Sequence, residues 1–243
     1  MQFSDTTNRT GVIQLIEDLT GTQSATTSSY PLATKTRDAN NTLAYYFVLA
    51  QSAEGRWQVD DTNHTNSPII DANVVANQAD YSFTTDGSST PNQVLDIYRV
   101  ECKDSTGYAS ELIPIDQYDV SGIALSEYLK TAGIPKYYDK IGNDIILYPK
   151  PSYNYTSGLT IYINRTASYF LSTDTTKKPG IPDVFHEYVA FRPAYQFCLR
   201  KGLPQTASLK VDMLAMEENI KSYYSTRAKD EVKMMTPAFR SSR

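Results

Sequence analysis

Two stripes of apolar residues near the C-terminal end constrain the fold of this chain more than any other feature. Apolar residues recur at steps of four and three in two segments, at Val184, Tyr188, Phe191, Tyr195 and Cys198 and then at Leu209, Met213, Met216, Ile220 and Tyr223. Because an α-helix has about 3.6 residues per turn, this spacing places one apolar stripe on each of two helices. Gly202 and Pro204 separate the stripes and suit the end of the first helix and the first position of the second. The pattern predicts an antiparallel helical hairpin.

The first fifty residues predict two more helices. Residues 11–19 have apolar side chains at helical spacing, and Gly21 is suited to stop that helix. A second helix starts at Pro31, in the favoured first position, and runs to about residue 52. Each of these helices has an apolar stripe that needs a partner, and a two-helix unit alone buries too little surface. We therefore expect the N-terminal and C-terminal helices to pack together as one bundle.

The middle of the chain has short runs of β-branched and aromatic residues between turn sequences. The expected strands are residues 94–102, 108–115, 136–140, 144–148 and 158–166, the first four paired as two hairpins. Together they predict a small antiparallel sheet. Residues 121–132 have helical spacing and predict a short helix between the hairpins.

These elements predict an α+β fold in which a helical bundle, made from the N- and C-terminal helices, carries an inserted antiparallel β-rich region. The expected bundle comprises residues 1–55 and 181–232, and the β-rich insertion comprises residues 56–180. Residues 233–243 follow as a C-terminal docking arm.

The arm contains no acidic residue and mixes apolar with basic side chains. Its candidate docking residues are Met234, Met235, Pro237, Phe239, Arg240 and Arg243. The apolar members would be exposed to water in an isolated subunit, so we interpret them as residues that dock on a partner.

Composition limits the class of protein. With 243 residues, of which 40% are apolar, the chain is long enough to bury a hydrophobic core. No apolar run approaches a membrane span, and the N-terminus lacks the order of a signal peptide, so we expect no membrane association. The net charge is −4, and because residues 221–243 carry +4, the first 220 residues carry −8. An acidic body argues against a protein that grips nucleic-acid phosphates across its surface.

No arrangement of reactive residues in the sequence predicts catalysis. The two histidines, His64 and His186, stand in no recognised catalytic motif, and no glycine-rich phosphate loop occurs. Residues 60–64 offer oxygen ligands but lack the glycine and distant glutamate of a calcium loop, so we interpret them as a solvated turn. Glu217 and Glu218 fall on the predicted outer face of the last helix. We expect no catalytic, cofactor-binding or metal-binding residue and no enzymatic activity.

The two cysteines and the many tyrosines indicate how the chain is stabilised and what surfaces it presents. Cys102 and Cys198 lie far apart in different predicted elements, which argues against a disulfide framework or a cysteine-rich metal site. The 19 tyrosines are amphipathic side chains that suit interfaces, although core filling explains part of the excess. The excess favours a chain with large contact surfaces.

Several strings of the sequence resemble a known family. They are residues 56–64 (RWQVDDTNH), 138–149 (YDKIGNDIILYP) and 179–186 (PGIPDVFH), together with the opening FSDTTN at 3–8 and the closing FRSSR at 239–243. In these strings the chain resembles the head-to-tail adaptor, or connector, proteins of tailed bacteriophages, and the likeness spans nearly the whole chain.

The resemblance implies a structural role in the neck of a virion that is assembled in the host cytoplasm. It implies a homo-oligomeric ring, usually of twelve subunits, beneath the portal protein, with a helical bundle and a β-rich part that meets tail or nozzle proteins. It further implies that the C-terminal arm reaches toward the portal and that DNA passes through the ring without specific binding.

Two alternatives from other classes stay open at this point. A tail-associated carbohydrate- or receptor-binding component would use the tyrosines of the β-rich region, provided that their rings line an exposed groove. A metal-dependent hydrolase would need a set of ligands that the sequence does not display.

Overall fold

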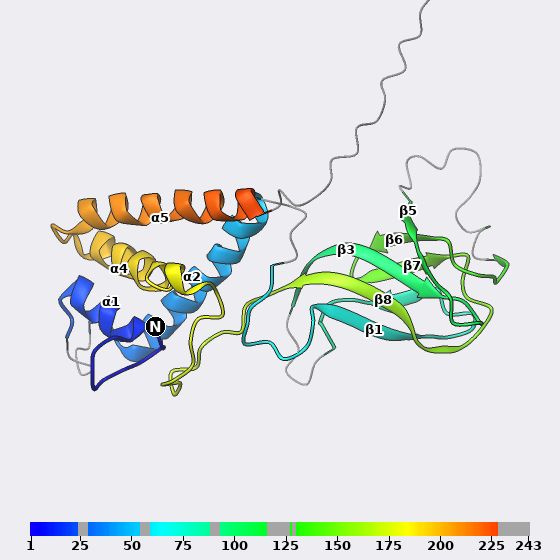
Figure 1. The fold of residues 1–243 in the computed structure, drawn as a ribbon, viewed down its shortest axis with the longest axis horizontal. Helices are drawn as coiled ribbons and strands as arrows, with labels where there is room; N and C mark the ends of the chain where they lie inside the picture. The colour runs from blue at the N-terminus through cyan, green and yellow to red at the C-terminus, as the bar shows by residue number, and fades with distance from the viewer. Residues whose placement is uncertain (24–28, 54–58, 88–92, 116–126, 128–129, 228–243) are drawn as a thin grey trace, which may run out of the picture.

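The computed structural model describes residues 1–23, 29–53, 59–87, 93–115, 127 and 130–227. Helices gather at one end of the molecule and strands at the other, as Figure 1 shows. Within the described residues the chain therefore has a mixed α+β fold, as the sequence predicts. Eight of the twelve residues of the expected helix at 121–132 lie outside these residues.

The helical end contains four α-helices in the described part of the chain. They are α1 (Val12–Thr20), α2 (Leu32–Ala53), α4 (Tyr188–Lys201) and α5 (Thr206–Arg227), and the short 3-10 helix η1 (Asp183–Phe185) precedes α4. Gly202 ends α4 in the left-handed conformation, with φ 65°, and the amide of Leu203 donates to the carbonyl of Cys198 at 3.0 Å. This is the helix stop that the sequence predicts.

Two details of the predicted hairpin are wrong. The first helix does not include Val184, because this residue belongs to η1 and is 74% exposed. The second helix starts at Thr206, two residues after Pro204, so proline precedes the helix and does not occupy its first position. The amide of Thr206 donates to the carbonyl of Leu203 at 3.2 Å, which tightens the turn before α5.

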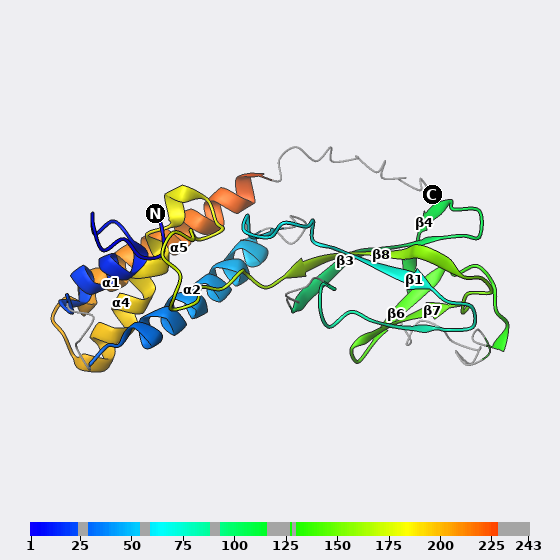
Figure 2. The same cartoon turned by 90° about the horizontal axis from the view of Figure 1, so that it is seen from below.

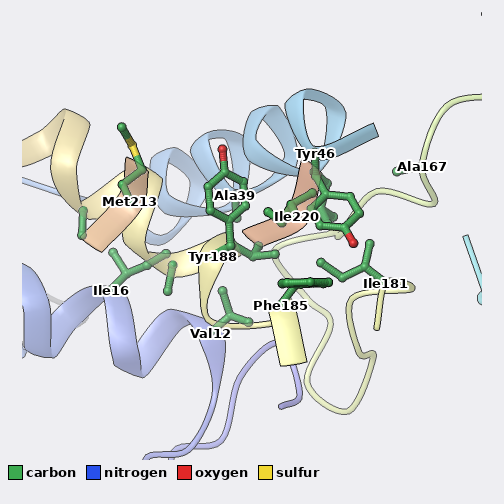
Figure 3. Packing of buried hydrophobic residues seen from close by; sticks show 14 of the residues in the cluster. Val12, Ile16, Ala39, Tyr46, Ala167, Ile181, Phe185, Tyr188, Met213 and Ile220 are labelled. Atoms are coloured by element: carbon green, nitrogen blue, oxygen red, sulfur yellow. The ribbon is translucent and has the colours of Figure 1, made fainter. Parts of the chain in front are cut away.

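One hydrophobic cluster lies between the helices. α4 packs against α1, α2 and α5, and α2 also packs against α5. Figure 3 shows side chains from all four helices in this cluster, among them Val12, Ile16, Ala39, Tyr46, Tyr188 and Ile220. Tyr46 and Tyr188 are fully buried, and complete burial of a large apolar side chain stabilises a fold by about 1.5–3 kcal/mol.

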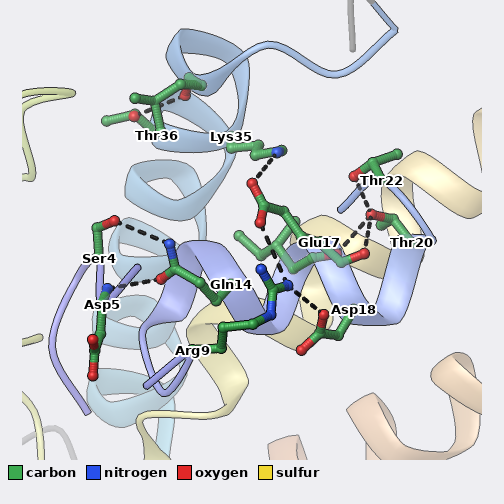
Figure 4. A network of polar contacts seen from close by, with 12 residues as sticks. Ser4, Asp5, Arg9, Gln14, Glu17, Asp18, Thr20, Thr22, Lys35 and Thr36 are labelled. Carbon is green, nitrogen blue, oxygen red and sulfur yellow. Dashed lines mark hydrogen bonds and ion pairs between the residues drawn. The ribbon is translucent and has the colours of Figure 1, made fainter. Parts of the chain in front are cut away.

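A buried ion pair joins α1 to α2 beside this cluster. The ammonium of Lys35 lies 2.9 Å from the carboxylate of Glu17, and their side chains are 1% and 7% exposed. Arg9 also approaches Glu17, at 3.6 Å, and bonds Asp18 at the surface (Figure 4). The pair is a charged connection inside the helical end, where removal of one partner would leave the other uncompensated.

The strands form two four-stranded sheets in the described residues, where the sequence analysis expected one small sheet. The first has the order β1 (Ile69–Val74), β8 (Tyr155–Arg165), β3 (Val94–Lys103) and β4 (Ala109–Glu111). The second has the order β2 (Asp80–Ser82), β7 (Asp144–Tyr148), β6 (Tyr137–Ile141) and β5 (Ile113–Pro114). Figure 2 shows the sheets as two layers, and one cluster of buried side chains draws on both. The β-rich end is therefore a sandwich with its own core.

The strand expected at 108–115 divides between the two sheets and adds the edge strand β5 to the second. Ser110 pairs with Cys102 in the first sheet, and the amide of Leu112 still donates to Val100 of that sheet at 2.9 Å. The next amide, that of Ile113, donates to the carbonyl of Lys136 at 3.0 Å, and β5 then runs parallel to β6. The predicted all-antiparallel pairing is therefore wrong at this strand.

Candidate docking site at the joint between helices and sheets

The predicted docking residues, Met234, Met235, Pro237, Phe239, Arg240 and Arg243, lie outside the described residues. The structure instead describes the surface from which this segment leaves the fold. α5 ends at Arg227, beside the last turn of α2 and the two segments that connect the helices to the sheets (Figure 1). We call these two segments, residues 59–68 and 165–182, the joint.

Side chains and backbone groups tie the two segments of the joint together. The amide of Thr62 donates to the carbonyl of Gly180 at 3.0 Å, and the side-chain amide of Asn63 donates to Lys178 at the same distance. Nε2 of His64 lies 3.1 Å from the carbonyl of Thr166. Because contacts between the two segments extend along their length, the joint is a paired structure and not two separate linkers.

Asp61 is the buried centre of the joint. Its side chain accepts from the backbone and side-chain amides of Asn63 at 2.8 and 2.9 Å and from the amide of Ser168 at 3.0 Å, and the residue is 2% exposed. The interpretation of residues 60–64 as a solvated turn is therefore wrong at this position. Gly180 is required beside it, since a Cβ there would lie 1.5 Å from Oδ1 of Asp61.

Arg165, the last residue of β8, fixes the sheet end of the joint. Its guanidinium donates to both carboxylate oxygens of Asp60, at 3.1 and 2.8 Å, to Asp86 at 2.9 Å and to the carbonyl of Asn66. Burial alone would lower the pKa of Arg165, but the hydrogen bonds to Asp60 and Asp86 outweigh it and raise the pKa above its usual value. The residue is 2% exposed, so this is a fully enclosed, multiply bonded charge.

A cleft of about 560 Å³ opens where the joint meets the ends of α2 and α5. It is lined by Phe47, Val59, Asp60, Thr62, Gly180, Ile181, Pro182, Asp183, Tyr223 and Tyr224. The lining combines apolar and aromatic side chains with two carboxylates, those of Asp60 and Asp183. The side chain of Asp183 is 85% exposed, whereas Asp60 is bonded to Arg165.

Aromatic contacts attach the end of α5 to α2 and η1 beside the cleft. The hydroxyls of Tyr46 and Tyr224 lie 3.0 Å apart, and the rings of Phe185 and Tyr223 meet edge to face with 5.3 Å between centroids. Such ring pairs add about 0.5–1.5 kcal/mol beyond the area that they bury. The last turns of α5 are thus attached both to α2 and to η1.

Glu217 faces inward and not outward as the sequence analysis expected. The hydroxyl of Tyr188 donates to its carboxylate at 2.9 Å, and Glu217 is half-buried. Burial raises the pKa of Tyr188, and the hydrogen bond to Glu217 raises it further. Glu218 is exposed, as expected.

The histidines and the acidic residues serve structural contacts. His186 is 2% exposed, and its Nε2 lies 2.9 Å from the carbonyl of Ile181 while Nδ1 lies 2.9 Å from the amino group of Met1. Burial lowers the pKa of His186. In the part of the chain that the structure describes, no group of three or more His, Cys, Asp or Glu side chains could hold a metal ion. Cys102 and Cys198 are free and buried in different elements.

The geometry defines a class of protein before any relative is considered. It is a two-core α+β protein with buried charged residues at the joint and a cleft near the end of its last described helix. None of the described helices is both long and apolar enough to cross a membrane.

Comparison with protein families places the chain. Residues 10–233 match the SU10 adaptor protein family, and the chain therefore belongs to this family. The resemblance to phage adaptors is thereby confirmed. Membership gives the protein a structural role as a phage adaptor that associates with other head or tail components in the neck of the virion. A comparison with curated proteins finds no match.

Proposed function

We propose that this protein forms a ring below the portal of a tailed phage, joins the head to the tail and continues the channel for DNA. The family supports an adaptor role. The observation that carries the proposal is the joint, where Asp61 and Arg165 form buried contacts between segments that lead to two different cores. An adaptor has to hold two docking surfaces in a fixed relation, and this joint is suited to that task.

The proposal assigns a task to each part of the chain. Residues 1–55 and 181–232 form the helical bundle, residues 56–180 the β-rich insertion, and residues 233–243 the docking arm. The separate hydrophobic clusters of the helical and β-rich ends support the first division. In this arrangement the β-rich part meets tail or nozzle proteins and the arm binds the portal protein.

The ring in this proposal contains twelve copies, as the resemblance implies, and assembles in the host cytoplasm. A ring closes through a heterologous interface, in which one face of each subunit meets a different face of the next. The body of the chain is acidic, with −8 in its first 220 residues, and like charges repel DNA phosphates within a Debye length of about 8 Å. DNA therefore passes the channel without specific binding.

A carbohydrate- or receptor-binding role receives less support. The exposed tyrosines in the described residues are Tyr108, Tyr169 and Tyr223. They belong to the turn between β3 and β4, to the loop after β8 and to α5, so the two that fall within residues 56–180 lie in separate loops and not on one strand surface. An aromatic groove for a sugar would need several such rings side by side.

Portal docking by the arm tests the proposal. Burial of two methionines and one phenylalanine stabilises a complex by about 1.5–3 kcal/mol per side chain, before the cost of ordering the arm. Repetition around a ring multiplies that gain. The variant Met234→Ser, Met235→Ser, Phe239→Ser should lose binding to the purified portal protein while its far-ultraviolet circular-dichroism spectrum stays unchanged.

A matched control substitutes the polar residues of the same segment, as Thr236→Ala, Ser241→Ala and Ser242→Ala. It changes the same number of positions and should bind the portal normally. Full docking by the serine variant, or by a chain that ends at residue 232, would refute the role of the arm.

A further inference from the structure

The cleft at the joint lies beside the point at which the chain leaves the fold. Tyr223 and Tyr224 line it, and α5 ends at Arg227. Four residues of helix span roughly 6 Å, so the C-terminal segment starts about one helical turn from the cleft.

The cleft presents two kinds of chemistry to a ligand. Tyr223, which is 36% exposed, gives it an accessible aromatic surface, and Phe47, Val59 and Ile181 lie beneath at 1–5% exposure. The carboxylate of Asp183 is 85% exposed, and the imidazole of His186, 3.3 Å from it, has a pKa lowered by burial and is neutral at pH 7. An apolar peptide that also carries a cation would match both parts of this surface.

The segment that follows α5 has this composition. Residues 228–243 contain Met234, Met235 and Phe239, and the last eleven residues carry three cations and no acid. The five residues from 228 to 232 can span about 16 Å when extended, which is enough for the chain to turn back from Arg227 to the cleft. Because such a short connection gives an effective concentration in the millimolar range, the segment meets this cleft before any free ligand does.

We propose that, in the free subunit, residues 233–243 dock into the cleft of their own chain. Phe239 and the two methionines pack against Tyr223 at the mouth of the cleft, and Arg240 or Arg243 pairs with Asp183. The docked segment keeps its apolar residues out of water until a partner that binds them more tightly displaces it. The inference rests on the proposed function only for the identity of that partner, the portal, and the docking itself concerns the isolated protein.

Cross-linking within the free protein tests the proposal. Val184 is 74% exposed and adjoins Asp183, so the double variant Val184→Cys, Phe239→Cys places one thiol at the edge of the cleft and one on the arm. Treatment with a short bis-maleimide should give a cross-linked product with the mass of one chain. The native thiols, Cys102 and Cys198, are buried and stay as they are.

Val211→Cys, Phe239→Cys is the matched control. Val211 is 67% exposed, yet it lies twelve residues before Tyr223 on α5, or roughly 18 Å along the helix. The yield of intramolecular product should be about tenfold higher for the Val184 pair, the scale expected when one site is held near the other. Asp183→Lys in the Val184 pair should reduce that yield, and Asp183→Glu should preserve it.

Three results would overturn the inference: equal yields from the two pairs, a product with the mass of two chains only, or no effect of Asp183→Lys. Each of them leaves portal docking to its own experiment, because the cross-linking uses no portal protein. Conversely, a chain that ends at residue 232 and still binds the portal would refute the portal-docking role of the arm. That result would leave the cross-linking result unaffected.

Discussion

At the scale of single residues, the buried pair of Lys35 and Glu17 yields a sharp prediction. Lys35→Met keeps most of the side-chain volume but leaves the carboxylate of Glu17 inside the helical end, with Arg9 as a partner at 3.6 Å. Removal of one partner of a buried pair costs about 3–5 kcal/mol. The free energy of unfolding, measured by urea denaturation, should fall by that amount.

Arg37→Met on the same helix is the control for this change. The side chain of Arg37 is 60% exposed, and its buried partner Asp38 keeps hydrogen bonds from Arg200 and Tyr30, so the loss of Arg37 should cost less than about 1 kcal/mol. An equal fall in the free energy of unfolding for the two variants would show that the burial of Lys35 does not cause the loss of stability.

His186 predicts a pH dependence of stability. Burial lowers its pKa in the folded protein below the ordinary value of 6.5, with a further contribution from the neighbouring amino group of Met1. The unfolded chain then binds the proton more readily than the folded one, so stability is complete above about pH 6.5 and falls as the pH falls below it. His186→Gln should flatten the dependence of the urea midpoint between pH 7 and pH 5.

His64→Gln is the paired control, since it removes the other histidine of the chain. It should leave the slope of the wild-type protein intact. An unchanged slope in His186→Gln would show that other groups cause the loss of stability in acid.

Residue-level detail of this kind could not be predicted from the sequence. Periodicity places apolar residues inside, and it predicted Tyr188, Cys198 and Ile220 correctly as core residues. It gives no reason to bury Lys35 or Asp61, because burial of a charge depends on partners far away in sequence. Glu17 lies 18 positions from Lys35, and Ser168 lies 107 positions from Asp61.

At the scale of elements, the passage from β4 to β5 carries the chain from the first sheet to the second. Leu112 is 2% exposed at this passage and belongs to the core between the sheets, whereas the next residue, Ile113, is 58% exposed. Leu112→Ala should destabilise the protein by about 2–5 kcal/mol, because it removes buried atoms and leaves a cavity.

Ile113→Ala deletes an aliphatic side chain at the adjacent position and serves as the control. Its effect on the urea midpoint should be small, since an exposed side chain has little packing to lose. Equal losses at the two positions would argue against the observed passage of the strand between the layers.

Helices were predicted better than sheets for a physical reason. A helix is closed by local hydrogen bonds, so spacing and end signals such as Gly21 and Gly202 suffice to find it. β2 and β5 have three and two residues and exist only through partners elsewhere in the chain. β1 pairs with β8, where Ile69 opposes Tyr162, a partner that no local pattern can name.

At the scale of the whole molecule, the two cores are independent of each other and the joint determines how they are placed. The helical cluster includes Ala167 and Ile181 of the joint, while the cluster of the sheets ends at Ile163 of β8. Asp60 and Asp61 connect these parts through Arg165 and Ser168. The sequence predicts a solvated turn at residues 60–64 and gives no sign that polar side chains of this segment make buried contacts. The position of the candidate cleft follows from these contacts and was likewise not predictable.

Gly180→Ala tests whether the joint fixes the relation between the two ends. The added Cβ would lie 1.5 Å from Oδ1 of Asp61 and would displace a carboxylate that holds three hydrogen bonds. Loss of such buried bonds costs about 1–3 kcal/mol per group, while the core of the sheets lies outside the joint and the four helices supply most of the other core. We expect the far-ultraviolet circular-dichroism spectrum to persist while small-angle X-ray scattering shows a broader distribution of shapes. Gly142→Ala, at a turn with φ 62° and open space around it, should leave the scattering curve unchanged. A wild-type scattering curve from Gly180→Ala would contradict a fixed joint, because nothing would then depend on the contacts of Asp61.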